Sequence, residues 1–296
     1  MDIQEILKKI RPTLSQSSLK TYSSILKGIF NKDDNNKDKD FNQEYFIKNY
    51  KTVINNLPQE PNKRKTYLAS IIVLCNDKDK CKPYYDLMND DADKVATFNK
   101  TQKKNEKQEQ VGFLEPDELQ NKYKDLAKKN KTLWAKPENM SDFQNLQNQI
   151  ILALYTLIEP RRLLDYTEMK INNIDKEKDN YIYSNKFYFN RYKTAKYKGQ
   201  AIVELPKELI SLLKKWIKLI KDKSDYLLFD INFNKLNQVG LNKRLQNILG
   251  KGRSVNILRH SHLSNKYNPK ELKELEQTAN NMGTSIGQII NTYVKE

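Results

Sequence analysis

A lysine-rich polar segment separates two regions whose apolar residues recur at helical spacing. The segment from Lys100 to Gln110 contains no apolar side chain and mixes Lys, Gln, Asn and Glu, which is typical of a linker. A chain of 296 residues is long enough for two domains that each bury a core. We therefore expect a helical domain over residues 1–98, a basic polar linker over 99–112 and a second domain over 113–296.

The apolar pattern of each region predicts its secondary structure. The first region predicts short amphipathic helices, with stripes such as Leu19, Leu26 and Phe30 after a serine cluster that offers N-caps. In the second region, residues 179–183, 186–192 and 200–205 are enriched in Tyr, Phe, Ile and Val, which is typical of strands. The rest of that region predicts helices, including 206–220, 239–249, 254–265, 270–281 and 285–293. The predicted fold class is mainly α, with a small antiparallel β-sheet in the C-terminal domain.

The charge of the chain indicates a polyanionic partner. Fifty-three Lys and Arg residues face thirty-seven Asp and Glu residues, a formal net charge of +16, which favours nucleic acid over a merely solvated basic surface. The lysines are scattered instead of lining one amphipathic helix, so a membrane surface is the weaker candidate. No apolar run approaches the roughly 18 residues of a membrane span, and the N-terminus lacks a signal-peptide pattern, so we expect an intracellular protein. Cys75 and Cys81 fit neither a zinc pattern nor a disulfide framework, and we expect both to stay reduced.

A cluster of cations opens the helix expected after Pro61. Lys63, Arg64 and Lys65 crowd its first turn, where positive charge opposes the helix dipole. Such cations either belong to a solvated, frayed helix end or are held for an external anion. We favour the second interpretation and predict that these three residues contact DNA phosphates.

The end of the chain carries the most specific pattern. Ile257-Leu258-Arg259-His260-Ser261 is followed by Met282-Gly283-Thr284-Ser285 and, nine residues after Thr284, by Tyr293. This order resembles the second half of the active site of the tyrosine recombinases, the phage-integrase-like family. There a helix carries Arg, His and a small hydroxyl residue, a Leu-Gly-His-Ser-like turn follows, and the nucleophilic Tyr lies nine residues beyond the turn's His or Trp. The resemblance implies that Tyr293 is the nucleophile, although Tyr293 also shares a helical apolar face with Ile286, Ile289 and Ile290 and would suit a core position.

The chemistry of that family calls for three cations besides the tyrosine. A Tyr phenolate can form a covalent phosphate ester without a metal, two guanidinium groups can stabilise the phosphate, and a Lys can protonate the departing oxygen. The family's first Arg follows an apolar helix and precedes an acidic residue by three places. Aligning Asp165 with that acidic residue makes Arg162 the match, with Arg161 in reserve because Pro160 replaces the family's Gly. Arg259 is the second Arg.

The family's Lys lies on a β-hairpin, in a Lys-Thr-Gly-Lys-like turn before a Val-Pro-Leu-Pro-like strand. Here the corresponding residues are Arg191 to Gly199, followed by Val203-Glu204-Leu205-Pro206. Lys193 matches the Lys-Thr position and is our choice, and Lys196 fits better if the strand is aligned without a gap. A solvated hairpin tip has a similar composition.

Two positions depart from the family pattern. Asn256 stands where the family has His, and an amide cannot accept a proton at neutral pH. Thr284 stands where the family has His or Trp and is a poorer charge stabiliser. His260 is expected to support the site by hydrogen bonding. His262 lies two residues further along the helix, so the two imidazoles point in different directions, and we expect no metal site.

The resemblance implies a site-specific recombinase or integrase that acts through a 3′-phosphotyrosine intermediate, without a cofactor, as a homo-tetramer on double-stranded DNA. It implies a core-binding-like N-terminal domain and a tyrosine-recombinase-like catalytic domain. The Lys- and Asn-rich composition would suit viral genome integration or a mobile element. A type IB topoisomerase-like enzyme and a DNA-binding protein of the same fold with impaired catalysis are the two alternatives.

Overall fold

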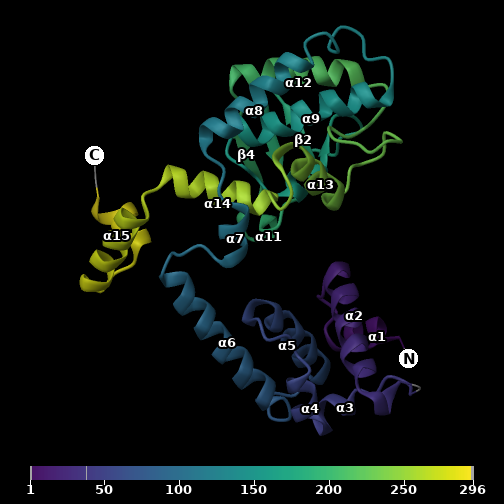
Figure 1. Cartoon of the computed structure of the whole chain (residues 1–296), viewed down its shortest axis with the longest axis vertical. Helices are drawn as coiled ribbons and strands as arrows, with labels where there is room; N and C mark the ends of the chain where they lie inside the picture. The colour runs from purple at the N-terminus through teal and green to yellow at the C-terminus, as the bar shows by residue number, and fades with distance from the viewer. Residues whose placement is uncertain (1, 38, 295–296) are drawn as a thin grey trace. The chain divides into compact units, whose positions relative to one another are not determined.

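The structure, a computed structural model, describes residues 2–37 and 39–294 as two compact units. Unit 1 covers Met1–Lys103 and unit 2 covers Lys104–Glu296. The colour ramp of Figure 1 separates them, purple to blue for unit 1 and blue to yellow for unit 2. Among the described residues, no helix combines the length and the apolar character needed to cross a membrane.

Unit 1 contains helices and no strand among its described residues. Its elements are α1 (Ile3–Ile10), α2 (Gln16–Lys32), η1 (Asp34–Asn36), α3 (Glu44–Lys48), α4 (Tyr50–Asn55), α5 (Pro61–Cys75) and α6 (Lys82–Lys100). One apolar face from each of the longer helices forms the core, in which Leu26, Phe46 and Leu68 are completely buried. The thiols of Cys75 and Cys81 are buried at the junction of α5 and α6 and form no disulfide.

The charged residues at the start of α5 do not all match the expected phosphate-binding cluster. Glu60 accepts hydrogen bonds from the backbone N–H groups of Asn62 and Lys63, so a carboxylate already caps this helix. Arg64 donates two hydrogen bonds to Asp91 on α6, of 2.7 and 2.6 Å, and the Asp91 side chain is only 1% exposed. Arg64 is therefore a partner in a buried ion pair, which argues against its predicted role as a phosphate contact. Lys63 and Lys65 are exposed.

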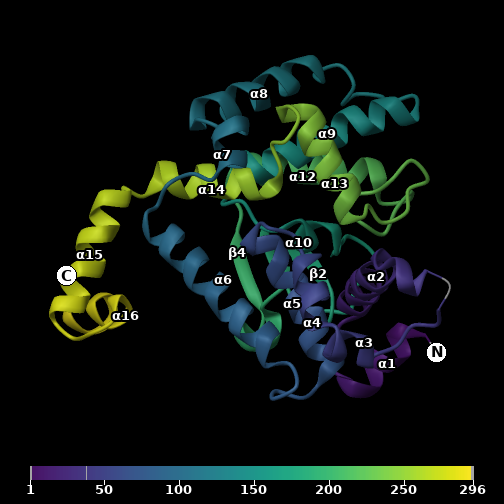
Figure 2. The ribbon, with the colours of Figure 1, turned by 60° about the horizontal axis from the view of Figure 1, so that its bottom comes forward.

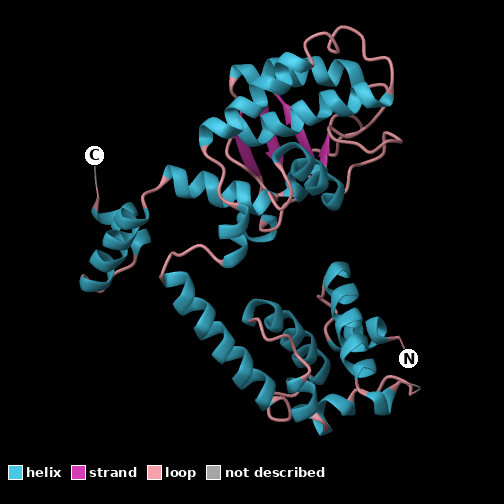
Figure 3. Ribbon diagram, viewed as in Figure 1, coloured by secondary structure: helices cyan, strands magenta, loops and turns pink. Residues whose placement is uncertain are grey.

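Unit 2 places helices around a small sheet. Its helices before the C-terminal segment are α7 (Glu106–Val111), α8 (Pro116–Lys129), α9 (Met140–Thr156), α10 (Leu163–Thr167), α11 (Ala195–Lys198), α12 (Lys207–Ile220) and α13 (Gln238–Leu249). Figure 3 shows the strands beside these helices. The core joins Ile150 of α9 and Trp216 of α12 to Phe187 and Phe189 of the sheet, so it lies between the helices and the strands.

The sheet is mixed, and the expectation of a purely antiparallel sheet is wrong in this respect. Its order is β1 (Met169–Lys170), β2 (Asn180–Tyr183), β3 (Lys186–Phe189) and β4 (Ala201–Glu204). The last three strands pair antiparallel, but β1 pairs parallel with β2. A strand of two residues has too little side-chain alternation to be recognised in a sequence.

The chain ends in a segment that lies outside the main core of unit 2. It comprises α14 (Val255–Lys266), α15 (Pro269–Asn281), α16 (Ile286–Gln288) and η2 (Ile289–Tyr293). Only the first part of α14 contributes to the core, through Val255 and Leu258. Figures 1 and 2 both show α15 and the residues after it standing apart from the helices and strands of unit 2, at the far end of α14. We call residues 269–294 the terminal segment.

Candidate active site

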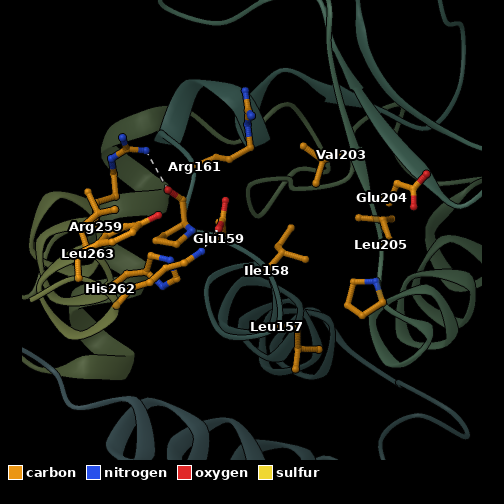
Figure 4. Close-up of a pocket in the computed structure, with 14 residues that line it drawn as sticks. Leu157, Ile158, Glu159, Arg161, Val203, Glu204, Leu205, Arg259, His262 and Leu263 are labelled. Carbon is orange, nitrogen blue, oxygen red and sulfur yellow. Dashed lines mark hydrogen bonds and ion pairs between the residues drawn. The ribbon is translucent and has the colours of Figure 1, made fainter. Parts of the chain in front are cut away.

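Two arginines from distant parts of the sequence line one hollow of unit 2. Arg161 follows α9, Arg259 lies on α14, and the hollow beside them has a volume of about 710 Å³. Leu157, Ile158 and Leu205 form part of its apolar wall. Figure 4 shows these side chains around the hollow. We call this hollow the arginine pocket.

Packing and hydrogen bonds fix Arg259 at the pocket. Val255, Leu258 and Ser261 recur at helical spacing and form the buried face of α14. Ser261 Oγ accepts a hydrogen bond of 2.9 Å from the backbone N–H of Leu114, which ties the helix to the start of the unit. Arg259 lies beside this buried face and donates from Nη1 to the carbonyl oxygen of Pro160 at 2.9 Å, as Figure 4 shows. The loop between α9 and α10 thus connects directly to α14.

Arg161 and its neighbour Arg162 occupy different environments. Arg161 donates from Nε to Asp165 Oδ2 at 2.8 Å, and its guanidinium carbon lies 3.9 Å from the ring centre of Phe189 and 5.5 Å from that of Tyr192. The side chain is therefore held by an ion pair and by two aromatic faces. Arg162 is the exposed N-cap residue of α10, and its guanidinium forms no hydrogen bond or ion pair among the described residues. The structure places Arg161, the reserve choice, in the pocket with Arg259.

The carboxylate of Asp165 is buried beneath these arginines. Asp165 is 3% exposed, and its second oxygen, Oδ1, has no hydrogen-bond partner among the described residues. Burial raises the pKa of Asp165 above its ordinary value of 3.8, and the positive charges of Arg161, Arg162 and Arg259 oppose that rise. Its negative charge is thus stabilised by three cations at once.

A buried tyrosine shares this environment. The hydroxyl of Tyr155, near the end of α9, also lacks a hydrogen-bond partner among the described residues. Burial raises the pKa of Tyr155 well above its ordinary value, and the charge of Asp165 adds to the effect while that of Arg259 opposes it. Tyr155 therefore stays a neutral phenol that can donate one hydrogen bond.

One asparagine connects this region to the turn that carries the predicted lysine. Asn180, completely buried at the start of β2, donates from Nδ2 to the carbonyl oxygens of Asp165 and Arg191, both at 2.9 Å. Its Oδ1 accepts from the backbone N–H of Arg191 at 2.6 Å. Lys193 lies two residues beyond Arg191 in the connection between β3 and β4, where its side chain is exposed. Lys196 is exposed on α11 in the same connection.

Tyr293 does not line the arginine pocket. It is 59% exposed at the end of η2, in the terminal segment. Gly283, with φ of 63°, ends α15 by adopting a conformation that favours glycine, and the N–H of Thr284 then donates to Ala279 at 2.9 Å. Thr284 Oγ1 lies 2.6 Å from Gln288 Oε1 within the same segment. The structure therefore does not bring Tyr293 and Thr284 together with the two arginines.

The remaining predicted residues lie on α14 with different surroundings. Asn256 is exposed. The ring of His260 stacks on that of Phe113, with 6.3 Å between centroids and 9° between planes, and it does not line the pocket. His262 does line the pocket. Within residues 2–37 and 39–294, no three His, Cys, Asp or Glu side chains gather where they could hold a metal ion.

Sequence reasoning missed Asn180, Tyr155 and the pocket position of His262. Asn180 acts through hydrogen bonds between segments that are separated in sequence, and a lone Asn before a strand carries no motif that predicts such bonds. Tyr155 belongs to an apolar helical stripe and is indistinguishable there from an ordinary core residue. The partial signal for His262 was its spacing of three residues from Arg259, which places both on adjoining parts of one helix face.

No protein-family model matches the chain, and no curated protein matches it in sequence. Among solved structures, the crystal structure of XerA recombinase is similar with a TM-score of 0.37 and 13% sequence identity, over 93% of this chain and 98% of that one. Similarity at this level does not establish a common fold or a common activity.

Replacing Asp165 by Asn should give a pH-dependent difference in stability. The folded chain binds the Asp165 proton more tightly than the unfolded chain, because burial raises the pKa. Ionisation therefore lowers stability as pH rises from the ordinary value of 3.8 through the raised pKa. The free energy of unfolding of the wild type minus that of Asp165→Asn should fall across this window. Urea titrations followed by Trp fluorescence report on unit 2, which contains both Trp134 and Trp216.

Asp175→Asn is the matched control, with the opposite expected sign. A hydrogen bond from Lys178 lowers the pKa of Asp175, so this carboxylate contributes stability above its ordinary pKa and loses it as pH falls. A difference for Asp165→Asn that rises with pH, as in the control, would contradict the proposed balance between burial and the surrounding arginines.

Proposed function

We propose that the chain cleaves and rejoins DNA strands through a covalent bond between Tyr293 and a DNA phosphate. The observation that carries this proposal is the convergence of Arg161 and Arg259 on one pocket from segments far apart in sequence. Two guanidinium groups match the oxygens of a phosphodiester and remain protonated throughout the reaction. Their order along the chain, with Lys193 between them and Tyr293 after them, adds support.

In the proposed reaction, the hydroxyl oxygen of Tyr293 attacks the scissile phosphorus. A bond forms between that oxygen and phosphorus, the bond from phosphorus to the 5′ oxygen breaks, and the 3′ end stays attached to the protein. The tyrosine proton leaves to a base, and His262 is the imidazole that the pocket offers for this purpose. The departing 5′ oxygen takes a proton from Lys193. Attack by a 5′ hydroxyl reverses these steps, so no external energy source or metal is consumed.

The position of the lysine turn favours this assignment. Arg161 contacts the ring of Tyr192, the residue immediately before Lys193, and Asn180 fastens both ends of this arrangement. The turn that contains Lys193 is therefore in contact with Arg161 through the ring of Tyr192. Lys196 lies on α11, further along the same connection, and remains the alternative proton donor.

The proposed reaction requires the terminal segment to move. Met282, Ile290, Tyr293 and Val294 are each more than half exposed, so the segment presents apolar surface that it does not bury itself. Docking this surface against unit 2, in the same chain or in a second copy, would bury it and deliver Tyr293 to the arginine pocket. The proposed enzyme is thus active only after docking.

The proposed substrate is double-stranded DNA. The net charge of +16 supplies long-range attraction, and the exposed Lys63 and Lys65 of unit 1 are the proposed contacts to DNA phosphates. A tetramer on two DNA sites would allow strand exchange instead of simple relaxation.

DNA binding without cleavage is the second candidate function. Asn256 lacks the proton-accepting ability of a His, and Thr284 is hydrogen-bonded within the terminal segment. A chain that had lost catalysis would still keep the basic surface. Covalent trapping separates the two candidates.

Tyr293→Phe should abolish the covalent adduct with nicked duplex DNA and leave DNA binding unchanged, because it removes only the nucleophilic oxygen. Denaturing gel electrophoresis detects the adduct, and gel shift measures binding. Tyr183→Phe is a matched control, since Tyr183 is 58% exposed and lies on β2. Specific binding by the wild type without any adduct would favour the second candidate function.

Arg161→Ala should reduce the initial rate of adduct formation about 100-fold or more, the usual effect of removing one donor to a developing charge. Arg162→Ala should reduce it less than tenfold, because Arg162 does not line the pocket. Arg161→Lys keeps the charge near Asp165 and controls for loss of folding. A larger loss in Arg162→Ala would restore Arg162 as the phosphate ligand.

Mixing two inactive variants tests how Tyr293 reaches the pocket. If the terminal segment docks on a second copy, a mixture of Tyr293→Phe and Arg259→Ala should form adduct, because one chain supplies the tyrosine and the other an intact pocket. The adduct should then contain only the Arg259→Ala chain, which a size tag identifies. An inactive mixture beside an active wild type would show that each chain uses its own tyrosine.

A further inference from the structure

Unit 2 contains a smaller hollow apart from the arginine pocket. It has a volume of about 340 Å³ and lies where α9 and α13 meet the loop that contains Asp230. None of its lining residues lines the arginine pocket. Its polar side chains have no role in the proposed reaction.

Arg244 of α13 is the unusual member of this lining. The side chain is partly buried, yet it forms no ion pair among the described residues. Its one hydrogen bond within the described chain runs from Nη1 to Asn148 Oδ1 and is long, at 3.4 Å. Burial lowers the pKa of Arg244, and the charge of Asp230 opposes that effect. Removing a cation from water is costly unless a partner replaces the lost solvation.

Asp230 does not neutralise Arg244 directly. Its Oδ1 accepts hydrogen bonds from the backbone N–H groups of Asn232 and Asn234, at 2.8 and 3.0 Å, which hold the carboxylate in its own loop. The lining thus contains two cations, Lys243 and Arg244, and one carboxylate whose Oδ1 is already hydrogen-bonded within its own loop.

Neutral donors surround the guanidinium group. Gln144 and Asn148 lie one turn apart on α9, and Asn247 lies one turn beyond Arg244 on α13, so all three face the hollow. No hydrogen bond is recorded within the described chain for the side chains of Gln144, Lys243 or Asn247. The NH₂ groups of these amides add donors to those of Lys243 and Arg244, so the hollow carries more charged donors than carboxylate acceptors.

We propose that this hollow binds a phosphate group, with Arg244 as its main ligand. A guanidinium group donates two parallel hydrogen bonds that fit two phosphate oxygens, and Lys243 adds a second charge. The surrounding amides supply further donors, and the volume suits a small group better than a large apolar ligand. The phosphate is either a backbone phosphate of DNA, which rests on the proposed function, or a free phosphate ion.

Inorganic phosphate is the probe for the site itself. Titration calorimetry of the full chain with sodium phosphate, against sodium chloride of equal ionic strength, should show saturable binding. Arg244→Met should weaken that binding about 10- to 100-fold, the range expected for lost hydrogen bonds to a charged group. Lys214→Met removes an exposed cation of α12 and is the matched control, which should bind phosphate as the wild type does.

Folding controls keep the test decisive. Because Arg244 lacks an acid partner, Arg244→Met should unfold at the same temperature as the wild type or higher in the absence of phosphate. If Arg244→Met fails to fold, Asn247→Leu is the second variant, because it alters an exposed residue. Asn247→Leu should also weaken phosphate binding. Wild type without saturable binding, or Arg244→Met with unchanged affinity, overturns the proposal.

Duplex DNA distinguishes the two sources of phosphate. If a backbone phosphate occupies the site, Arg244→Met should reduce the slope of log K against log salt for DNA by about 1. An unchanged slope, with phosphate binding lost, identifies a free phosphate ion as the ligand. The calorimetric result does not depend on Tyr293, so an absent covalent adduct would overturn the proposed function and leave this site standing.

Discussion

The geometry of the arginine pocket depends on the buried carboxylate of Asp165. It forms an ion pair with Arg161 and lies within the electrostatic reach of Arg162 and Arg259. The backbone oxygen of the same residue accepts a hydrogen bond from Asn180, which also holds the turn leading to Lys193. A buried charge is costly to desolvate, and three nearby cations offset part of that cost. The same residue therefore sets the position of one arginine and connects it to the lysine turn.

The sequence predicts the helices and strands of unit 2 more accurately than the surroundings of each arginine. The expected strands at 179–183, 186–192 and 200–205 correspond to β2, β3 and β4. Choosing between Arg161 and Arg162 required knowing which way the chain turns after Pro160, and an alignment that counts three places to Asp165 cannot supply this. The ion pair instead spans four places, from Arg161, which precedes the N-cap of α10, to Asp165 in its first turn. The environment of Arg64 similarly depends on its ion pair with Asp91, which is distant in sequence and gives no local signal.

For Tyr293 in the terminal segment, the position along the chain and the position in space are separate questions. Residue types and spacing single out Tyr293 along the chain, but the position of Tyr293 in space depends on where an apolar helix face packs. Ile290 and Tyr293 of that face are more than half exposed, and hydrophobic burial is the dominant force that would draw them to another surface. Linking the proposed nucleophile to such a face would couple chemistry to docking, so a chain whose terminal segment is not docked would not cleave DNA.

The partners of the arginines indicate their different uses. Arg64 is paired bidentately with a carboxylate that is 1% exposed, which leaves it little capacity to bind an external anion. Arg161 gives one nitrogen to Asp165 and rests on aromatic rings, which orient it while leaving its other donors for a ligand. Among the described residues, Arg244 has neither a carboxylate nor a ring as a direct partner, although it is also partly buried. Since the desolvation of a cation must be offset by some partner, an anion bound at Arg244 would stabilise the folded state.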